Sequence, residues 1–90
     1  MEARRCVRLP NAAGLHARPC SAIARTALGF ESELVVECGG RAVNGKSILE
    51  LMTLSAPQAT VLSLAARGRD AAELVRAIAE LVESGFGEQP

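Results

Sequence analysis

The sequence contains few aromatic residues, no excess of charge of either sign, and no long apolar segment. Two phenylalanines are its only aromatic residues, and ten basic residues balance ten acidic ones, so the formal net charge is zero. Nucleic-acid-binding proteins usually present a basic face or aromatic rings that stack on bases, and neither is expected here. The sequence has no apolar stretch long enough for a signal peptide or a membrane span, either after residues 1–5 or later. We therefore expect a cytoplasmic protein that neither inserts into membranes nor binds nucleic acid.

The three cysteines, Cys6, Cys20 and Cys38, are odd in number and widely spaced, with no Cys-x-x-Cys pair. This pattern argues against a disulfide framework or a structural zinc site, so we expect reduced thiols, no metal and no cofactor. His16 and Cys20 stand four residues apart and could share one face of a helix. A metal or redox module using these two side chains remains an alternative, although two ligands do not make a site. The other interpretation is that Cys20 packs in the core or at its rim.

The length of 90 residues predicts one domain, residues 1–90, with a single core. Alternating apolar residues predict strands at 5–9, 33–38, 41–43 and 60–66, with Gly39 and Gly40 forming a hairpin turn. Apolar residues spaced by three and four predict helices at 17–28, 48 to about 54, and 71 to near 85. The last five residues are expected to be loosely held. The resulting order, βαββαβα, predicts an α+β two-layer sandwich with the helices on one face of the sheet.

The only histidine, His16, is predicted to lie at the N-terminal cap of the first helix. Pro19 fits the first turn, because the first amides of a helix have no intrahelical acceptor. Those free amides, the helix dipole and Arg18 together make a site for an anion such as phosphate. The dipole and the guanidinium also favour the neutral imidazole, which is a nucleophile. The pattern indicates a histidine that is itself phosphorylated, and a histidine that only caps the helix is the alternative.

A second motif begins at Ser47, which forms a capping-box pattern with Glu50. The serine hydroxyl is expected to accept a hydrogen bond from the Glu50 amide, and the Glu50 side chain to reach back to the Ser47 amide. Asp70 and Glu73 predict the same arrangement at the last helix. A phosphate on Ser47 would suit the helix terminus but would add close to two negative charges. Three apolar residues beside it form either a docking patch or part of the core: Ile48, Leu49 and Met52.

These two motifs and the element order make the chain resemble the histidine-containing phosphocarrier (HPr) family of the bacterial phosphoenolpyruvate-dependent sugar phosphotransferase system. The motifs are Gly-Leu-His-Ala-Arg-Pro at 14–19 and Val-Asn-Gly-Lys-Ser-Ile at 43–48, and the resemblance extends to the Gly-Phe-Gly-Glu tail at 85–88. It implies an open-faced sandwich of four antiparallel strands with three helices on one side. It also implies that His16 accepts a phosphoryl group at Nδ1 from phosphorylated enzyme I and passes it to an enzyme IIA domain.

The family's site residues carry over one by one. His16 matches the phosphorylated histidine, Arg18 the arginine that stabilises the phosphate, and the amides of Ala17 and Arg18 the backbone donors. Ser47 matches the serine that a dedicated HPr kinase/phosphorylase modifies in many relatives. The expected partner-binding residues are Cys20, Ile48, Leu49 and Met52.

Three positions depart from the family pattern: Ala13 replaces a small polar residue, Cys20 replaces alanine, and Cys38 replaces a larger or polar residue. None of them removes the nucleophile or its arginine. The sequence therefore predicts a monomeric carrier that acts with larger partner enzymes and is not a stand-alone catalyst. The alternative is a regulatory binding module of the same fold, controlled at Ser47 and not coupled to sugar transport. The sequence does not distinguish a carbohydrate-transport branch from a nitrogen-regulatory one.

Overall fold

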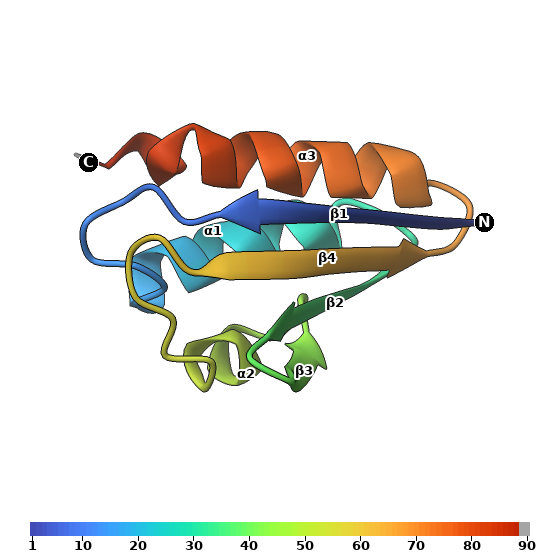
Figure 1. Ribbon diagram of the computed structural model, residues 1–90. Coiled ribbons are helices and arrows are strands. Elements are labelled where there is room, and N and C mark those ends of the chain that lie inside the picture. Colours follow the sequence, from blue (N-terminus) through green and yellow to red (C-terminus); the bar gives the residue numbers. More distant parts are fainter. Residues whose placement is uncertain (89–90) are drawn as a thin grey trace.

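The computed structural model describes residues 1–88 and shows a four-stranded antiparallel sheet with three α-helices packed on one face (Figure 1). The strands follow the order β1-β4-β2-β3, so β4 lies between β1 and β2. This arrangement confirms the predicted α+β two-layer sandwich with the order βαββαβα. The elements are β1 (Glu2–Arg8), α1 (Ala17–Leu28), β2 (Glu33–Cys38), β3 (Arg41–Asn44), α2 (Ile48–Met52), β4 (Val61–Arg67), α3 (Ala71–Glu83) and the 3₁₀ helix η1 (Gly85–Gly87).

The hydrophobic core lies between the sheet and the helices. In the central strand β4, Leu62, Leu64 and Ala66 are buried, whereas the alternate positions face the other side. Side chains alternate between the two faces of a strand, so one apolar set covers the whole helix-facing side. Fully burying a leucine contributes about 1.5–3 kcal/mol, which makes this layer the main source of stability. Within residues 1–88, no helix has the length and apolar character needed to span a membrane.

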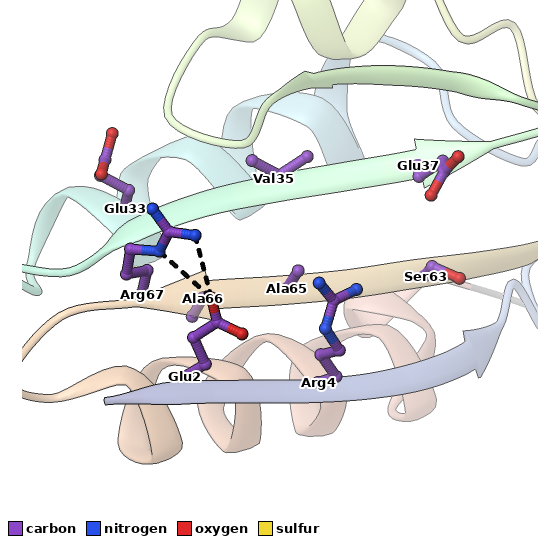
Figure 2. Close-up of a pocket in the computed structure, with 9 residues that line it drawn as sticks. All are labelled: Glu2, Arg4, Glu33, Val35, Glu37, Ser63, Ala65, Ala66 and Arg67. Carbon is purple, nitrogen blue, oxygen red and sulfur yellow. Dashed lines mark hydrogen bonds and ion pairs between the residues drawn. The ribbon is translucent and has the colours of Figure 1, made fainter.

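The other face of the sheet is polar and carries a shallow hollow of about 410 Å³ (Figure 2). Ser63 and Ala65 of β4 are small, and longer side chains from β1 and β2 stand on either side of them. At one end, Arg67 donates hydrogen bonds to Glu2 at 2.9 and 3.2 Å. His16 is not among the residues that line this hollow. This hollow is therefore separate from the candidate histidine site.

Several element boundaries differ from the predicted ones. Strand β1 begins at Glu2, three residues before the predicted start, because its whole length pairs with β4, from Glu2 opposite Arg67 to Arg8 opposite Val61. Helix α2 ends at Met52, two residues before the predicted end. Shortly after α2, Ser55 takes a positive φ of 50°, which no continuing helix allows. These ends depend on pairing and loop geometry, which local composition does not specify.

The capping box predicted at Ser47 forms in one half only, and the one predicted from Asp70 and Glu73 does not form, because the Asp70 amide donates to the Ser32 hydroxyl oxygen at 3.1 Å. Ser47 caps α2 as expected, with its hydroxyl accepting from the Glu50 amide at 3.2 Å. The Glu50 carboxylate, however, accepts from the Asn44 amide at 3.0 Å and not from the Ser47 amide. Asp70 precedes α3, but its side chain makes no capping bond there.

The Asp70 carboxylate instead binds the start of β2. It accepts from the Ser32 hydroxyl and from the amides of Ser32 and Glu31, at 2.9 and 3.0 Å for the two amides. The hydrogen bond from the Ser32 side chain and the bond from the Glu31 amide lower the pKa of Asp70 to about 2. Asp70 therefore joins the segments before β2 and α3, which are 38 residues apart in the sequence.

Candidate functional site

His16 occupies the N-terminal cap of α1, as the sequence predicts. Its backbone is extended (φ −105°, ψ −170°), and its carbonyl accepts from the Cys20 amide at 3.1 Å. The imidazole makes no capping hydrogen bond to the helix, and 41% of the side chain is exposed. His16 is therefore the N-cap residue through its backbone, and the imidazole itself does not cap the helix. The side chain is accessible to another molecule.

The first turn of α1 offers unused hydrogen-bond donors beside the ring. In the part of the chain that the structure describes, the amides of Ala17 and Arg18 have no acceptor. Pro19 has no amide hydrogen, and the first turn contains no acidic residue that would compete for the terminus. Arg18 is exposed and adds a permanent positive charge. This terminus can hold a doubly charged phosphoryl group.

The loop that carries His16 is fixed to the segment between α2 and β4. The amide of Leu15 donates to the Ala56 carbonyl at 2.8 Å, and the Leu15 side chain is buried. Gly14 has a φ of +66°, and a Cβ there would collide with the Ala56 carbonyl oxygen and with Pro57. Only glycine adopts this positive φ and leaves room for the Ala56 and Pro57 backbone at little cost. The close approach sets where the next two residues, and so the imidazole, can lie.

A carboxylate from the C-terminal tail reaches the ring. Nε2 of His16 lies 3.3 Å from Oε1 of Glu88, with hydrogen-bond geometry, and 3.1 Å from Oε2. In Figure 1 the loop after β1 and the end of α3 lie at the same end of the molecule, which brings these residues together. The Glu88 side chain is only 12% exposed. The expectation that the last five residues are loosely held is therefore wrong for Phe86, which packs against the core, and for Glu88, and residues 89–90 lie outside the described residues.

Asn11 anchors this carboxylate. The Asn11 side chain is completely buried and its Nδ2 donates to the Gly14 carbonyl at 2.7 Å and to Oε1 of Glu88 at 3.0 Å. Burial alone raises the pKa of Glu88, but the hydrogen bonds from Asn11 and His16, with the electrostatic effect of the His16 ring and the Arg18 guanidinium, outweigh burial and lower that pKa below its usual value. Glu88 is therefore ionised at neutral pH.

Cys20 does not lie on an accessible surface. Its side chain is fully buried on the core side of α1, and burial raises the pKa of its thiol to about 11. The predicted role of Cys20 in partner binding disagrees with this burial, because no part of the side chain can touch another molecule. Among residues 1–88, no cluster of three or more histidine, cysteine or acidic side chains could hold a metal ion. The structure therefore gives no support to the metal or redox alternative at His16 and Cys20.

The three apolar residues of α2 are exposed, so they lie on the surface and are not part of the core. Ile48, Leu49 and Met52 are 39%, 79% and 41% exposed, whereas Leu51 points into the core and is fully buried. Helix α2 packs against α1. We call Ile48, Leu49 and Met52 the α2 patch. Ser47 lies directly before it, at the cap of α2.

Sequence reasoning missed Asn11 and Glu88, which are 77 residues apart. An asparagine after a proline is typical of a loop, and a glutamate near the chain end is typical of a solvated tail. No local pattern marks the contact between them, because it exists only after β1 and α3 have packed together.

Comparison with known proteins agrees with this geometry. The family described as the PTS HPr component phosphorylation site matches residues 3–84. Phosphocarrier protein HPr of Neisseria meningitidis serogroup A is 41% identical over 85 residues, which cover 94% of this chain and 96% of the relative. The crystal structure of HPr-C-His from Thermoanaerobacter tengcongensis has a TM-score of 0.93 and 39% identity, covering 98% of this chain and 99% of that one.

A regulatory relative is also similar. The Bacillus subtilis catabolite repression protein Crh, whose structure is described as a swapped dimer, has a TM-score of 0.75 and 34% identity, covering 88% of this chain and 91% of Crh. Both kinds of relative share one fold, and the match to HPr proteins extends over nearly the whole chain. The chain therefore belongs to the HPr family of phosphocarrier proteins.

Proposed function

We propose that this protein carries phosphoryl groups on His16, accepting them from phosphorylated enzyme I and passing them to an enzyme IIA domain of the phosphotransferase system. The observation that carries this proposal is a 41% exposed imidazole at a helix terminus whose first two amides have no acceptor among residues 1–88. The site is a surface and not a cavity. A carrier needs such a surface, because its donor and its acceptor must reach the same nitrogen in turn.

The transfer follows from the arrangement of these groups. The lone pair of Nδ1 attacks the phosphorus of the donor phosphohistidine, a new P–N bond forms, and the electron pair of the broken P–N bond returns to the donor ring. The amides of Ala17 and Arg18 and the Arg18 guanidinium face the charge on the phosphoryl oxygens. Donation to the acceptor is the same displacement in reverse, with the acceptor nitrogen as nucleophile. Because the charged groups are already in place, little reorganisation is needed at either step.

The α2 patch is the proposed docking surface for both partners. Its exposed side chains, Leu49 above all, are large and apolar, and such residues dominate protein interfaces. Phosphorylation of Ser47 by a kinase/phosphorylase would place close to two negative charges beside this patch and weaken docking. The same proposal includes a cytoplasmic location, because the phosphoryl group on enzyme I comes from phosphoenolpyruvate.

Incubation with enzyme I and phosphoenolpyruvate tests the function. The protein is expected to gain one acid-labile, alkali-stable phosphoryl group by mass spectrometry and phosphorus NMR, and His16→Ala is expected to abolish it. Arg18→Ala should slow the transfer, whereas the matched variant Arg25→Ala, an exposed arginine in the last turn of the same helix, should not. Absence of phosphohistidine in the wild-type protein would overturn the carrier function. Phosphate found only on Ser47 after incubation with ATP and a kinase would favour the regulatory module instead.

A further inference from the structure

The contact between Glu88 and His16 determines where the ring proton sits. An ionised carboxylate only accepts hydrogen bonds, so the nitrogen that faces it must carry the hydrogen. That nitrogen is Nε2, at 3.3 Å from Oε1 and 3.1 Å from Oε2. In the neutral ring the other nitrogen then holds a lone pair. Glu88 thereby makes Nδ1 the nucleophilic atom of His16.

Asn11 makes this contact specific. Its amide nitrogen has two hydrogens, and both are used, one on the Gly14 carbonyl and one on Glu88. The Gly14 carbonyl also accepts from the His16 amide at 3.2 Å. Asn11 therefore connects the loop that sets the His16 backbone to the carboxylate that sets the His16 ring. Because its side chain is completely buried, it has little freedom to release either partner.

Phosphorylation at Nδ1 would create a positive charge next to this carboxylate. When the Nδ1 lone pair forms a P–N bond, the proton on Nε2 stays in place and the ring becomes cationic. When the group moves on, the P–N electron pair returns to Nδ1 and the neutral ring with its Nε2 proton is restored. No proton needs to be exchanged with water in either direction. The carboxylate stabilises the charged ring, as an aspartate does for histidine in a catalytic triad.

We propose that Glu88, held by Asn11, is a positioning residue for phosphoryl transfer, which directs the phosphoryl group to Nδ1 and stabilises the phosphorylated ring. The proposal rests on the proposed carrier function, since it names how the same histidine is prepared and held. Glu88 acts from the opposite nitrogen and so places no negative charge beside the incoming phosphoryl oxygens. It acts through the ring and does not touch the phosphoryl group.

Two variants of Glu88 separate positioning from charge. Glu88→Ala removes both the acceptor and the charge, whereas Glu88→Gln keeps an acceptor oxygen and removes the charge. Glu80→Ala and Glu80→Gln are the matched controls, because Glu80 is an exposed carboxylate on α3 and is not among the contacts of His16. Thermal unfolding followed by circular dichroism verifies that each variant is folded.

The first measurement uses the unphosphorylated protein. Nitrogen NMR of the ¹⁵N-labelled imidazole is expected to show the hydrogen on Nε2 in the wild type and in the Glu80 variants, and a mixture of tautomers in Glu88→Ala. Phosphoramidate, which phosphorylates histidine without any enzyme, is then expected to modify Nδ1 in the wild type and to give a larger share of the Nε2 product in Glu88→Ala. A wild-type tautomer and a wild-type product in Glu88→Ala would overturn the positioning role.

The second measurement is the equilibrium of phosphoryl exchange with enzyme I. Both Glu88 variants are expected to shift it about fivefold toward phosphorylated enzyme I, the effect of one partly exposed charge-assisted hydrogen bond. The Glu80 variants should leave it unchanged. An unchanged equilibrium in Glu88→Gln would overturn the charge-stabilising role. If the wild-type protein exchanges no phosphoryl group with enzyme I, the carrier function fails, but the NMR and phosphoramidate results still decide the role of Glu88.

Discussion

Replacing Gly14 with alanine is expected to disturb both stability and phosphorylation. At a φ of +66° an alanine costs about 1–2 kcal/mol, because its Cβ crowds the following carbonyl in this conformation. The new Cβ would also collide with the Ala56 carbonyl oxygen, which accepts the hydrogen bond from Leu15. Losing that bond costs about 1 kcal/mol more. The free energy of unfolding should therefore fall by about 2–3 kcal/mol in total.

Gly39→Ala is the matched control for this variant. Gly39 lies in the turn between β2 and β3 with a φ of +58°, and a Cβ there meets nothing within 4 Å. It should show only the backbone cost of about 1–2 kcal/mol. Urea denaturation followed by circular dichroism measures both losses. Thermal midpoints should fall in proportion, by about 4–8 °C for each kcal/mol in a domain of this size.

The two glycine variants should also differ in function. Gly14→Ala moves the loop that carries His16, so its rate of phosphorylation by enzyme I should drop at least tenfold, because small displacements of a reacting group are costly. Gly39→Ala should keep the wild-type rate. Equal losses of stability in the two variants would refute the close packing of Gly14 on Ala56. A wild-type rate in folded Gly14→Ala would refute the role of that packing in placing His16.

Three further outcomes are expected. Leu49→Glu should leave stability within about 0.5 kcal/mol yet raise the KM for enzyme I about tenfold, and an unchanged KM in steady-state kinetics would contradict docking on the α2 patch. The pKa of Asp70 is lowered to about 2 in the folded protein and is about 3.9 in the unfolded chain. The ionised Asp70 carboxylate therefore stabilises the folded protein above about pH 4. That contribution is lost as the pH falls toward 2, so urea denaturation across this range should show a flatter profile for Asp70→Asn, and parallel profiles would contradict this. Iodoacetamide should modify exposed Cys6 and spare buried Cys20, whose thiol has a pKa raised to about 11; equal labelling by peptide mass spectrometry would contradict the burial.

Local sequence signals predicted the helix and turn that carry the histidine. The proline in the first turn, the apolar spacing after it and Gly29 at the end gave the bounds of α1, and Gly39 and Gly40 gave the hairpin. The hydroxyl of Ser47 caps α2 as its position indicates. Each of these features depends on residues within four positions of one another, where backbone geometry alone decides the outcome.

Contacts between distant segments were not predictable in the same way. The carboxylates of Glu50 and Asp70 were expected to serve their own helices, and each binds another segment instead. A carboxylate finds the nearest free amide in space, and the packing of the strands decides which amide that is. Glu88 is the clearest example, because its partner Asn11 lies at the other end of the sequence. The sequence motif therefore located the histidine but not the carboxylate beside it.

The bond between Glu88 and His16 spans 72 residues, and this distance has a consequence for synthesis. Helix α1 and its histidine leave the ribosome early, but strand β1 has no neighbour until β4 emerges, and the ring has no carboxylate until residue 88 is free. Such distant pairings form late, because a long loop must close before they yield any contact. A nascent chain would thus expose its histidine without the group that orients it. Only a chain that has folded up to residue 88 would have a fully prepared imidazole.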